Sequence, residues 1–128
     1  MTRSKIIAGV KKERKVVAET GSTRSSRDGK GRFDLIPPCA LLRLARRYEG
    51  GAACHGDRNW EQGMSAGRCV DSAMRHLNQW VNCERDEDHL GAAMWNIAAL
   101  MFLEEKMPQH LDMPGMCGKQ PKPRHRAK

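Results

Sequence analysis

The segment HGDRNW, residues 55–60, places an imidazole, a carboxylate, a guanidinium, an amide and an indole within six positions. Gly56 indicates a turn, where neighbouring side chains point outward instead of packing into a core. Loops held by a rigid scaffold often carry binding or catalytic groups, so this density favours a ligand-binding role. An ordinary capped turn explains an Asp-Arg-Asn sequence equally well, and these residues alone leave both interpretations open.

Two histidines and an acidic run follow in segments with helical spacing. Asp86 is three residues before His89, so both side chains can face one point in a first helical turn. Asn96 lies two turns beyond His89 on the same flank, and His76 lies on the flank of an earlier helical segment. Carboxylate oxygens near arginines suit Mg²⁺ bound to a polyphosphate.

Each of these residues also has a structural explanation. A histidine on a helix flank is usually a surface group or a satisfied core residue. The acidic run can complement a helix dipole, and Asp71 with Arg75 has the spacing of an ordinary helical ion pair. The convergence of several such groups in three short segments favours a site.

Three segments have the apolar periodicity of helices and must position these groups. The first covers residues 37–51, opens with two prolines that fit a first helical turn, and ends at its two glycines. The second covers residues 65–82, with Ser65 as its N-cap. The third covers residues 86–105 and starts with carboxylates that suit a helix N-terminus. Because no segment alternates like a strand, we predict an all-α bundle.

The apolar residues predict which face of each helix is buried. In chain order the three faces comprise Leu41, Leu44, Ala45 and Tyr48, then Val70, Ala73, Met74, Leu77 and Val81, then Leu90, Ala93, Met94, Ile97, Leu100 and Met101. About three to four helices bury little surface, and the third is apolar over much of its circumference. We therefore expect a second copy of the chain to complete the core.

The positive charge is concentrated at the two ends of the 128-residue chain. Residues 1–32 hold ten Lys and Arg against three acidic residues, and residues 106–128 hold six against one. We assign residues 1–28 to a flexible basic arm, residues 29–105 to one helical domain, and the proline-broken remainder to a basic tail. Such tails can attract nucleic acid, but a nucleic-acid-binding domain would carry the charge on its body, so this role is not favoured.

The five cysteines form no CxxC pair, and their number is odd. This argues against a disulfide framework and against a structural zinc module. No stretch reads as a signal peptide or reaches transmembrane length. Scattered thiols suit a cytoplasmic protein, so we expect a cytoplasmic location and no membrane partner.

Four blocks of sequence occur in a characteristic order and spacing. They are GKGRFDLIPPCALLRLARRYEGGA, HGDRNWEQGM, SAMRHLNQW and DEDHLGAAMWNIAAL, and they cover roughly residues 29 to 105. Together they resemble the phage dATP/dGTP diphosphohydrolase N-terminal domain family, which is grouped with the MazG-like all-α NTP pyrophosphohydrolases. The resemblance implies a helical, oligomeric, Mg²⁺-dependent enzyme, with Mn²⁺ as an alternative ion. It would cleave deoxynucleoside triphosphates to monophosphate and pyrophosphate in phage nucleotide-pool control.

The resemblance and the patterns above together suggest three groups of site residues. Substrate binding is expected at Lys30, Arg32, Arg58, Asn59, Trp60 and Asn96. Metal binding is expected at Glu84, Asp86, Asp88 and His89. Catalysis is expected at Arg75, His76 and His89, where either histidine serves as a metal partner or as a general base.

One feature of MazG-like enzymes does not transfer. Those enzymes generally hold metal with ExxE on one helix and ExxD on the next. Neither pair occurs within the helices expected here, and the positions one turn after His89 are Ala92 and Ala93. Two non-enzymatic alternatives therefore stay open, namely a phage protein that binds nucleic acid through its basic tails and a scaffolding subunit without activity.

Overall fold

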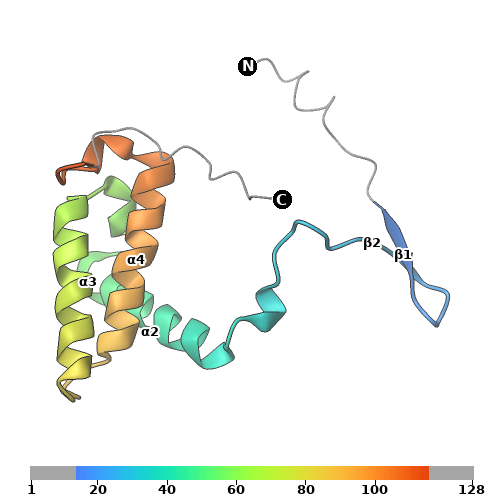
Figure 1. The fold of residues 1–128 in the computed structure, drawn as a ribbon, viewed down its shortest axis with the longest axis horizontal. Coiled ribbons are helices and arrows are strands. Elements are labelled where there is room, and N and C mark those ends of the chain that lie inside the picture. The colour runs from blue at the N-terminus through green and yellow to red at the C-terminus, as the bar shows by residue number, and fades with distance from the viewer. Residues whose placement is uncertain (1–13, 116–128) are drawn as a thin grey trace. The chain divides into compact units, whose positions relative to one another are not determined.

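The computed structural model describes residues 14–115. It has two compact units, one ending at Ile36 and one beginning at Pro37. None of the helices in the described range combines the length and apolar character needed to cross a membrane. The strands are β1 Lys15–Val17 and β2 Thr23–Ser25 (Figure 1). The α-helices are α2 Pro38–His55, α3 Ala66–Val81 and α4 His89–Lys106. Short 3₁₀ helices are η1 Phe33–Leu35, η2 Asn59–Gln62 and η3 Pro108–His110.

The first unit contains a β-hairpin, and here the expectation of no strands is wrong. β1 pairs antiparallel with β2, with Val16 opposite Arg24. Gly21 closes the turn by donating its N–H to the Ala18 carbonyl, and its φ of 83° favours glycine. Every residue of both strands is exposed. Without a buried face the strands show no alternation of apolar and polar residues, so periodicity could not reveal them.

The second unit confirms the predicted all-α fold, but α2 continues past the two glycines at which we expected it to end. Its C-cap is Gly56, which has a φ of 88° and donates its N–H to the Ala52 carbonyl. Gly50 and Gly51 are not among the residues with positive φ. A glycine inside a helix costs about 1 kcal/mol relative to alanine, which weakens a helix without ending it. The stop comes at Gly56, whose positive φ favours glycine and takes the chain out of the helical conformation.

Helices α3 and α4 form an antiparallel pair (Figure 1). Ser65 caps α3 by accepting a hydrogen bond from the Arg68 N–H, as the sequence predicted. Asp88 caps α4 by accepting one from the Gly91 N–H, so α4 begins slightly later than expected. Each cap satisfies an N–H group that has no partner within its helix.

Small residues form the contact between α3 and α4. The buried apolar residues are Ala66, Cys69, Ala73, Ala92, Ala93, Ala99 and Leu103. Leu103 and His89 are the largest fully buried side chains among the described residues. Small side chains let two helix backbones approach closely, so size rather than hydrophobicity determines which faces meet here.

The predicted apolar faces of these helices are therefore buried only in part. On α3 only Ala73 of the predicted face is buried, whereas Met74 is 66% and Val81 is 68% exposed. On α4 only Ala93 of the predicted face is buried, and Met101 is 64% exposed. Leu100 is half-buried and packs against the core cluster, whereas Met74, Val81 and Met101 stay at the surface of the single chain.

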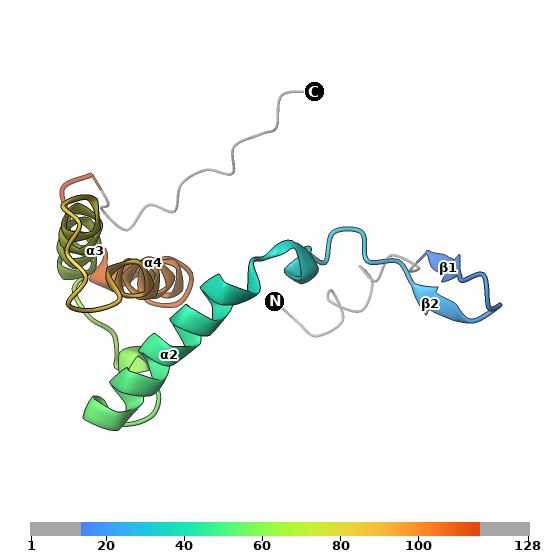
Figure 2. The same cartoon turned by 90° about the horizontal axis from the view of Figure 1, so that it is seen from below.

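Helix α2 packs on another side of α4 and crosses it. In Figure 2, α3 and α4 are seen nearly end-on, while α2 runs across the view. The rings of Tyr48 and Trp95 lie 6.0 Å apart between centroids, and the Arg43 carbonyl lies close to Gly91. No residue of α2 is fully buried. One side of α2 therefore faces solvent and its other side forms a cleft with α4.

Packing on the bundle continues beyond residue 105, into the segment assigned to the C-terminal tail. Met107 and Leu111 pack against the core cluster that contains Leu103. The Asp112 carboxylate accepts a hydrogen bond of 2.8 Å from the Gly67 N–H. The rest of the predicted tail, from residue 116, lies outside the described residues, as do residues 1–13 of the predicted N-terminal arm.

Candidate functional site

Two buried histidines meet where α3 ends and α4 begins. The Nδ1 atoms of His76 and His89 lie 2.9 Å apart. The residues are only 7% and 1% exposed. A hydrogen bond between two ring nitrogens needs a proton on one and a lone pair on the other, so the two Nδ1 atoms share one proton.

Carboxylates from the turn between the helices surround this pair. Asp86 Oδ1 lies 2.7 Å from His89 Nε2. Glu87 Oε1 lies 3.7 Å from His76 Nδ1 and 3.8 Å from His89 Nδ1. The Asp86 side chain is 70% exposed, so the nitrogens form the inner part of the cluster and the carboxylates form its rim.

The cluster contains two overlapping sets of potential metal ligands. In each set the ligand atoms lie within 4.8 Å of one another; the sets are His76, Glu87 and His89, and Glu84, Asp86 and His89. The first has two buried members, whereas both carboxylates of the second are exposed. Because His89 presents Nδ1 to one set and Nε2 to the other, its side chain connects them.

Burial keeps His76 in its neutral form. Desolvation lowers the pKa of His76, and the nearby positive charge of Arg47 lowers it further, while Glu87 acts in the opposite direction. The hydrogen bond from His89 lowers the pKa of Asp86, which stays ionised. At neutral pH the cluster therefore offers nitrogen lone pairs beside charged carboxylates.

Asp88, expected to bind metal, is engaged elsewhere. Its carboxylate accepts hydrogen bonds from Nε and Nη2 of Arg43, besides the capping bond from Gly91. The Arg43 guanidinium lowers the pKa of Asp88 to about 2, with smaller effects from the Gly91 N–H and Arg47. Asp88 belongs to neither potential ligand set. Its position supports a structural role in joining α2 to the start of α4.

We expect Asp88→Ala to lower the free energy of unfolding by about 1 kcal/mol, the usual loss for a helix cap. The 39% exposure of the side chain limits the further contribution of the ion pair. Because folding lowers the pKa of Asp88 from 3.8 to about 2, its stabilisation is complete above about pH 5 and is lost progressively as the pH falls through 2. Urea unfolding between pH 6 and pH 2.5 measures both effects.

Asp71→Ala is the matched control for this prediction. Asp71 is an exposed carboxylate that pairs with Arg75 one helical turn away. Such a pair contributes only about 0.2–0.5 kcal/mol. Equal losses for the two variants would contradict the structural role of Asp88.

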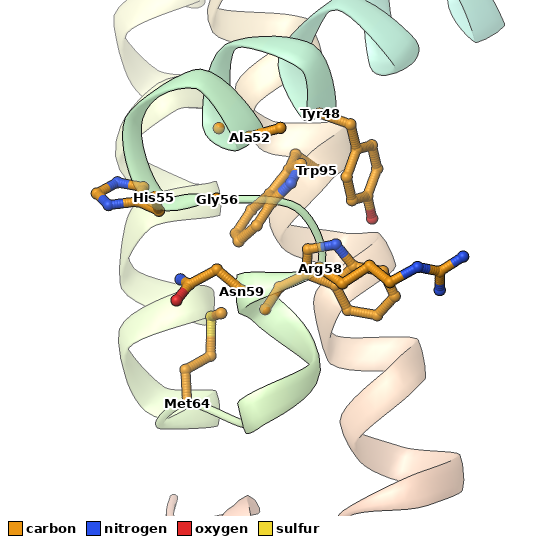
Figure 3. A pocket seen from close by; sticks show the side chains of 10 residues that line it. Tyr48, Ala52, His55, Gly56, Arg58, Asn59, Met64 and Trp95 are labelled. Carbon is orange, nitrogen blue, oxygen red and sulfur yellow. The ribbon is translucent and has the colours of Figure 1, made fainter.

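An aromatic pocket of about 210 Å³ lies between the C-terminal half of α2, the segment that follows it, and α4. Tyr48 and Trp95 stand side by side at its edge in Figure 3, and the Arg58 guanidinium extends away from Trp95. The Trp60 ring is held edge-to-face by Tyr48 and Phe102, with centroid distances of 5.9 and 4.9 Å. Three further lining residues are His55, Asn59 and Met64. Residues of the HGDRNW segment therefore line a pocket. Its first residue, His55, is also the last residue of α2.

A wider groove of about 510 Å³ adjoins this pocket and carries two arginines. The two hollows share Gly51, His55 and Trp95 as lining residues. Arg46 and Arg47 lie along the groove. The glycines of α2 have no atoms near the position of a missing Cβ, which keeps this part of the surface open.

Arg47 connects the groove to the histidine cluster. Its Nη1 donates a hydrogen bond of 3.1 Å to Glu87 Oε2, and Glu87 Oε1 faces the two imidazoles. Trp95 lies six residues after His89 on α4, which corresponds to about 9 Å along the helix axis. The aromatic pocket, the groove and the cluster thus follow one another along the α2–α4 side of the bundle.

The structure does not bring all predicted site residues together. His76, His89, Asp86 and Glu84 form the cluster, whereas Arg58, Asn59 and Trp60 border the aromatic pocket. Arg75 pairs with Asp71 at 2.8 Å, and the buried Asn96 amide donates to Ser72 and to the Ala92 carbonyl. Lys30 and Arg32 belong to the first unit, where Arg32 pairs with Asp34.

Sequence reasoning missed Glu87, Arg47 and the aromatic pair of Tyr48 and Trp95. Glu84 and Glu87 do have ExxE spacing, but they lie in the turn between α3 and α4 rather than within a helix. Two consecutive arginines before Tyr48 were a possible signal for a charged groove. The contact between Tyr48 and Trp95 had no local signal, because it joins distant segments.

A ligand cleft between helices, with ionisable side chains at its inner end, is typical of small all-α binding proteins and enzymes. A family model described as dATP/dGTP diphosphohydrolase, N-terminal, matches residues 20–112. The chain belongs to this family, which confirms the resemblance found in the sequence. No curated protein and no solved structure matches the chain.

Proposed function

We propose that the protein hydrolyses dATP and dGTP to the monophosphate and pyrophosphate. The family is named for a dATP/dGTP diphosphohydrolase. The observation that carries the proposal is the sequence of sites along α2 and α4: an aromatic pocket, a groove with two arginines, and a carboxylate–histidine cluster. These match the three parts of a nucleotide substrate, which are a ring, a phosphate chain and a reacting phosphorus.

The aromatic pocket suits the purine base. Its volume of about 210 Å³ is below the range of roughly 300–1,000 Å³ typical for sites that enclose a whole ligand, so it fits one ring system. Tyr48, Trp60 and Trp95 provide aromatic surface, and the Asn59 amide offers both a donor and an acceptor for the edge of the base. Arg58 pairs with Glu61 and lies at the rim.

The groove suits the phosphate chain. Arg46 and Arg47 would form charge-assisted hydrogen bonds with phosphate oxygens. In the proposed reaction a water oxygen bonds to the α-phosphorus, and the bond from that phosphorus to the bridging oxygen of the β-phosphate breaks. The two guanidinium groups would then stabilise the negative charge that grows on the leaving pyrophosphate.

Mg²⁺ is the proposed cofactor, with Mn²⁺ as an alternative, and the outer part of the cluster fits it. Mg²⁺ prefers oxygen ligands and commonly binds one or two carboxylates together with substrate phosphates. Glu84 and Asp86 present exposed carboxylates of this kind. The buried donors of His76 and His89 are nitrogens and do not suit Mg²⁺. When bound at Glu84 and Asp86, the ion would neutralise charge on the triphosphate.

The proposal is tested by incubating the full chain with each common dNTP and Mg²⁺ and separating the products. We expect dAMP or dGMP and pyrophosphate in equal amounts, with purines preferred. Diphosphate and inorganic phosphate as products would show a different cleaved bond, and the absence of any cleavage would refute the proposal. The biological setting that we propose is nucleotide-pool control by a phage in the bacterial cytoplasm.

We also propose that two copies associate through an open apolar face, defined by Met74, Leu77, Val81, Ile97 and Met101. Most of these residues lie one position or one helical turn from buried residues of α3 and α4. When two antiparallel helices pack together, the residue after a contact position on one helix points to a given side of the pair. The residue after a contact position on the other helix points to that same side. These exposed side chains therefore form one surface, opposite to α2.

A second copy is the proposed occupant because this surface would complete a core in which Leu103 is the only large apolar side chain that is fully buried among the described residues. Contiguous exposed apolar surfaces often mark an interface. We expect light scattering after size-exclusion chromatography to give at least a dimer. Met74→Glu and Val81→Glu should each weaken association by at least tenfold, since each would bury a charge.

Val17→Glu is the matched control, because Val17 and Val81 are 67% and 68% exposed and Val17 lies in the separate hairpin unit. It should leave the molecular mass unchanged. A wild-type chain that stays monomeric at high concentration, or dimers that survive both charged variants, would contradict the proposed face.

Nucleic-acid binding is the second candidate function, and the hairpin unit gives it some support. A hollow of about 550 Å³ on this unit is lined by Arg14, Arg24 and Arg27 together with Ser25 and Ser26. Three guanidinium groups near hydroxyl groups suit phosphates. Tight, strongly salt-dependent DNA binding that Arg24→Ala reduces, without cleavage of any dNTP, would favour this function over hydrolysis.

A further inference from the structure

We infer that His76, His89 and Glu87 form a binding site for a divalent transition-metal ion of the Zn²⁺ or Co²⁺ type. The site differs in ligands and in ion class from the Mg²⁺ position proposed at Glu84 and Asp86. The inference concerns binding of the ion and does not depend on the proposed hydrolysis.

The chemistry of the donor atoms selects the ion. The three residues offer two imidazole nitrogens and one carboxylate oxygen. Imidazole suits Zn²⁺, Cu²⁺, Fe²⁺ and Ni²⁺, whereas Mg²⁺ favours carboxylates, carbonyls and water. Both imidazoles are buried, so water would not readily replace them as ligands of an ion bound there.

The distances between the donors are close to those that an ion requires. Metal–nitrogen and metal–oxygen bonds of about 2.1 Å in a tetrahedral arrangement separate neighbouring ligand atoms by about 3.4 Å. The Nδ1 atoms of His76 and His89 are 2.9 Å apart, and Glu87 Oε1 lies 3.7 and 3.8 Å from them. Each separation would need to change by no more than about half an ångström.

Outer partners already hold two of the ligands in a suitable orientation. When His89 Nε2–H donates to Asp86, the lone pair of His89 Nδ1 is directed toward His76. Histidines that bind metals nearly always donate their other ring N–H to a carboxylate, a carbonyl or a water molecule. Arg47 holds Glu87 through Oε2, which leaves Oε1 toward the imidazoles. Asp86 and Arg47 are thus positioning residues for this site.

Binding displaces the one proton that the two Nδ1 atoms share, so the His76 ring must adopt the tautomer protonated on Nε2. Three protein ligands then leave at least one coordination position open. Catalytic zinc sites commonly have three protein ligands and a fourth position for water or substrate. The Glu87 side chain is 41% exposed, so solvent can reach this side of the site.

The test uses the full chain, freed of metal with a chelator and then dialysed. Calorimetric titration with ZnCl₂, CoCl₂ and MgCl₂ should give one Zn²⁺ or Co²⁺ per chain, bound at least 100-fold more tightly than Mg²⁺. Bound Co²⁺ should show visible absorption of a site with nitrogen ligands. His76→Gln should weaken Co²⁺ binding at least 100-fold, and Glu87→Gln should weaken it about 10- to 100-fold.

Glu61→Gln is the matched control for Glu87→Gln, because each glutamate pairs with an arginine and only Glu87 faces the imidazoles. If His76→Gln does not fold, Glu87→Gln still decides, since its side chain is partly exposed. Mg²⁺ binding as tight as Zn²⁺ binding, or Co²⁺ binding that Glu87→Gln leaves unchanged, would overturn the inference. A loss caused by Glu84→Gln but not by Glu87→Gln would place the ion at the outer carboxylates instead. Because no readout uses turnover, failure here is distinct from failure of the proposed hydrolysis.

Discussion

Replacing His89 by asparagine is expected to lower kcat/KM for dATP by at least 100-fold while the helical content is retained. His89 contacts His76 through Nδ1 and Asp86 through Nε2, and it belongs to both potential ligand sets. The shorter asparagine amide cannot reach both partners, so residue 89 no longer connects His76 with Asp86. Changes to outer partners of metal ligands alone typically cost 10- to 100-fold, and the loss of this central residue should exceed that range. Steady-state pyrophosphate release measures kcat/KM, and far-ultraviolet circular dichroism measures the helical content.

Two further variants make this result specific. His110→Asn is the matched control, because His110 lies in η3 and belongs to neither ligand set; its activity should stay near that of the unmodified protein. Asp86→Asn removes the charge of a proposed Mg²⁺ ligand that also contacts His89, and we expect a decrease at least as large as that of His89→Asn. Full activity of a folded His89→Asn protein would show that the cluster has no part in turnover.

Gly91→Ala is expected to lower the free energy of unfolding by about 1–3 kcal/mol, because overpacking and loss of the helix cap outweigh the higher helix propensity of alanine. A Cβ at this position would lie 2.7 Å from Asp88 Oδ2 and 3.4 Å from the Arg43 carbonyl oxygen. Asp88 cannot move away without giving up its bonds to Arg43 and to the Gly91 N–H. The added methyl group therefore pushes on the N-cap residue of α4, and it disturbs α2 through the bond between Asp88 and Arg43. Urea unfolding monitored by circular dichroism measures the loss.

Gly50→Ala is the matched control, and its effect should have the opposite sign. Gly50 lies inside α2, and no atom lies within 4 Å of the position of its missing Cβ. Alanine there should stabilise the protein by about 0.4–1 kcal/mol, because it favours the helix and restricts the unfolded chain. If Gly91→Ala were as harmless as Gly50→Ala, the close contact between α2 and the start of α4 would be incorrect.

The sequence predicted the helices well but predicted their buried faces poorly. Ser65 and the acidic run before His89 located the starts of α3 and α4, because capping depends on residues that are adjacent in sequence. The choice of face depends on how closely two backbones can approach. Hydrophobicity favours Met74 and Ile97, whereas close approach selects the alanines and Cys69. The hairpin escaped prediction because neither of its strands buries a face.

The candidate site was predictable only where it is local or made of chemically distinctive residues. Asp86 and His89 are three residues apart, and their contact follows from helical spacing. The approach of His76 to His89 follows once α3 and α4 pair antiparallel with a short turn. The cleft depends on how α2 crosses α4, a tertiary feature that places Arg47 near Glu87 and Tyr48 near Trp95. The hydrophobic periodicity of α2 or of α4 does not predict how the two helices cross.

The alanine contact between α3 and α4 restricts how this protein can evolve. At Ala66 and Ala92, which are completely buried, any larger residue would have to separate the helices that hold His76 and His89 together. Exposed positions of the same helices that lie outside the open apolar face carry no such restriction. Mutations should therefore accumulate at those exposed positions long before they occur in the contact between α3 and α4, where a change in packing also changes the geometry of the histidine cluster.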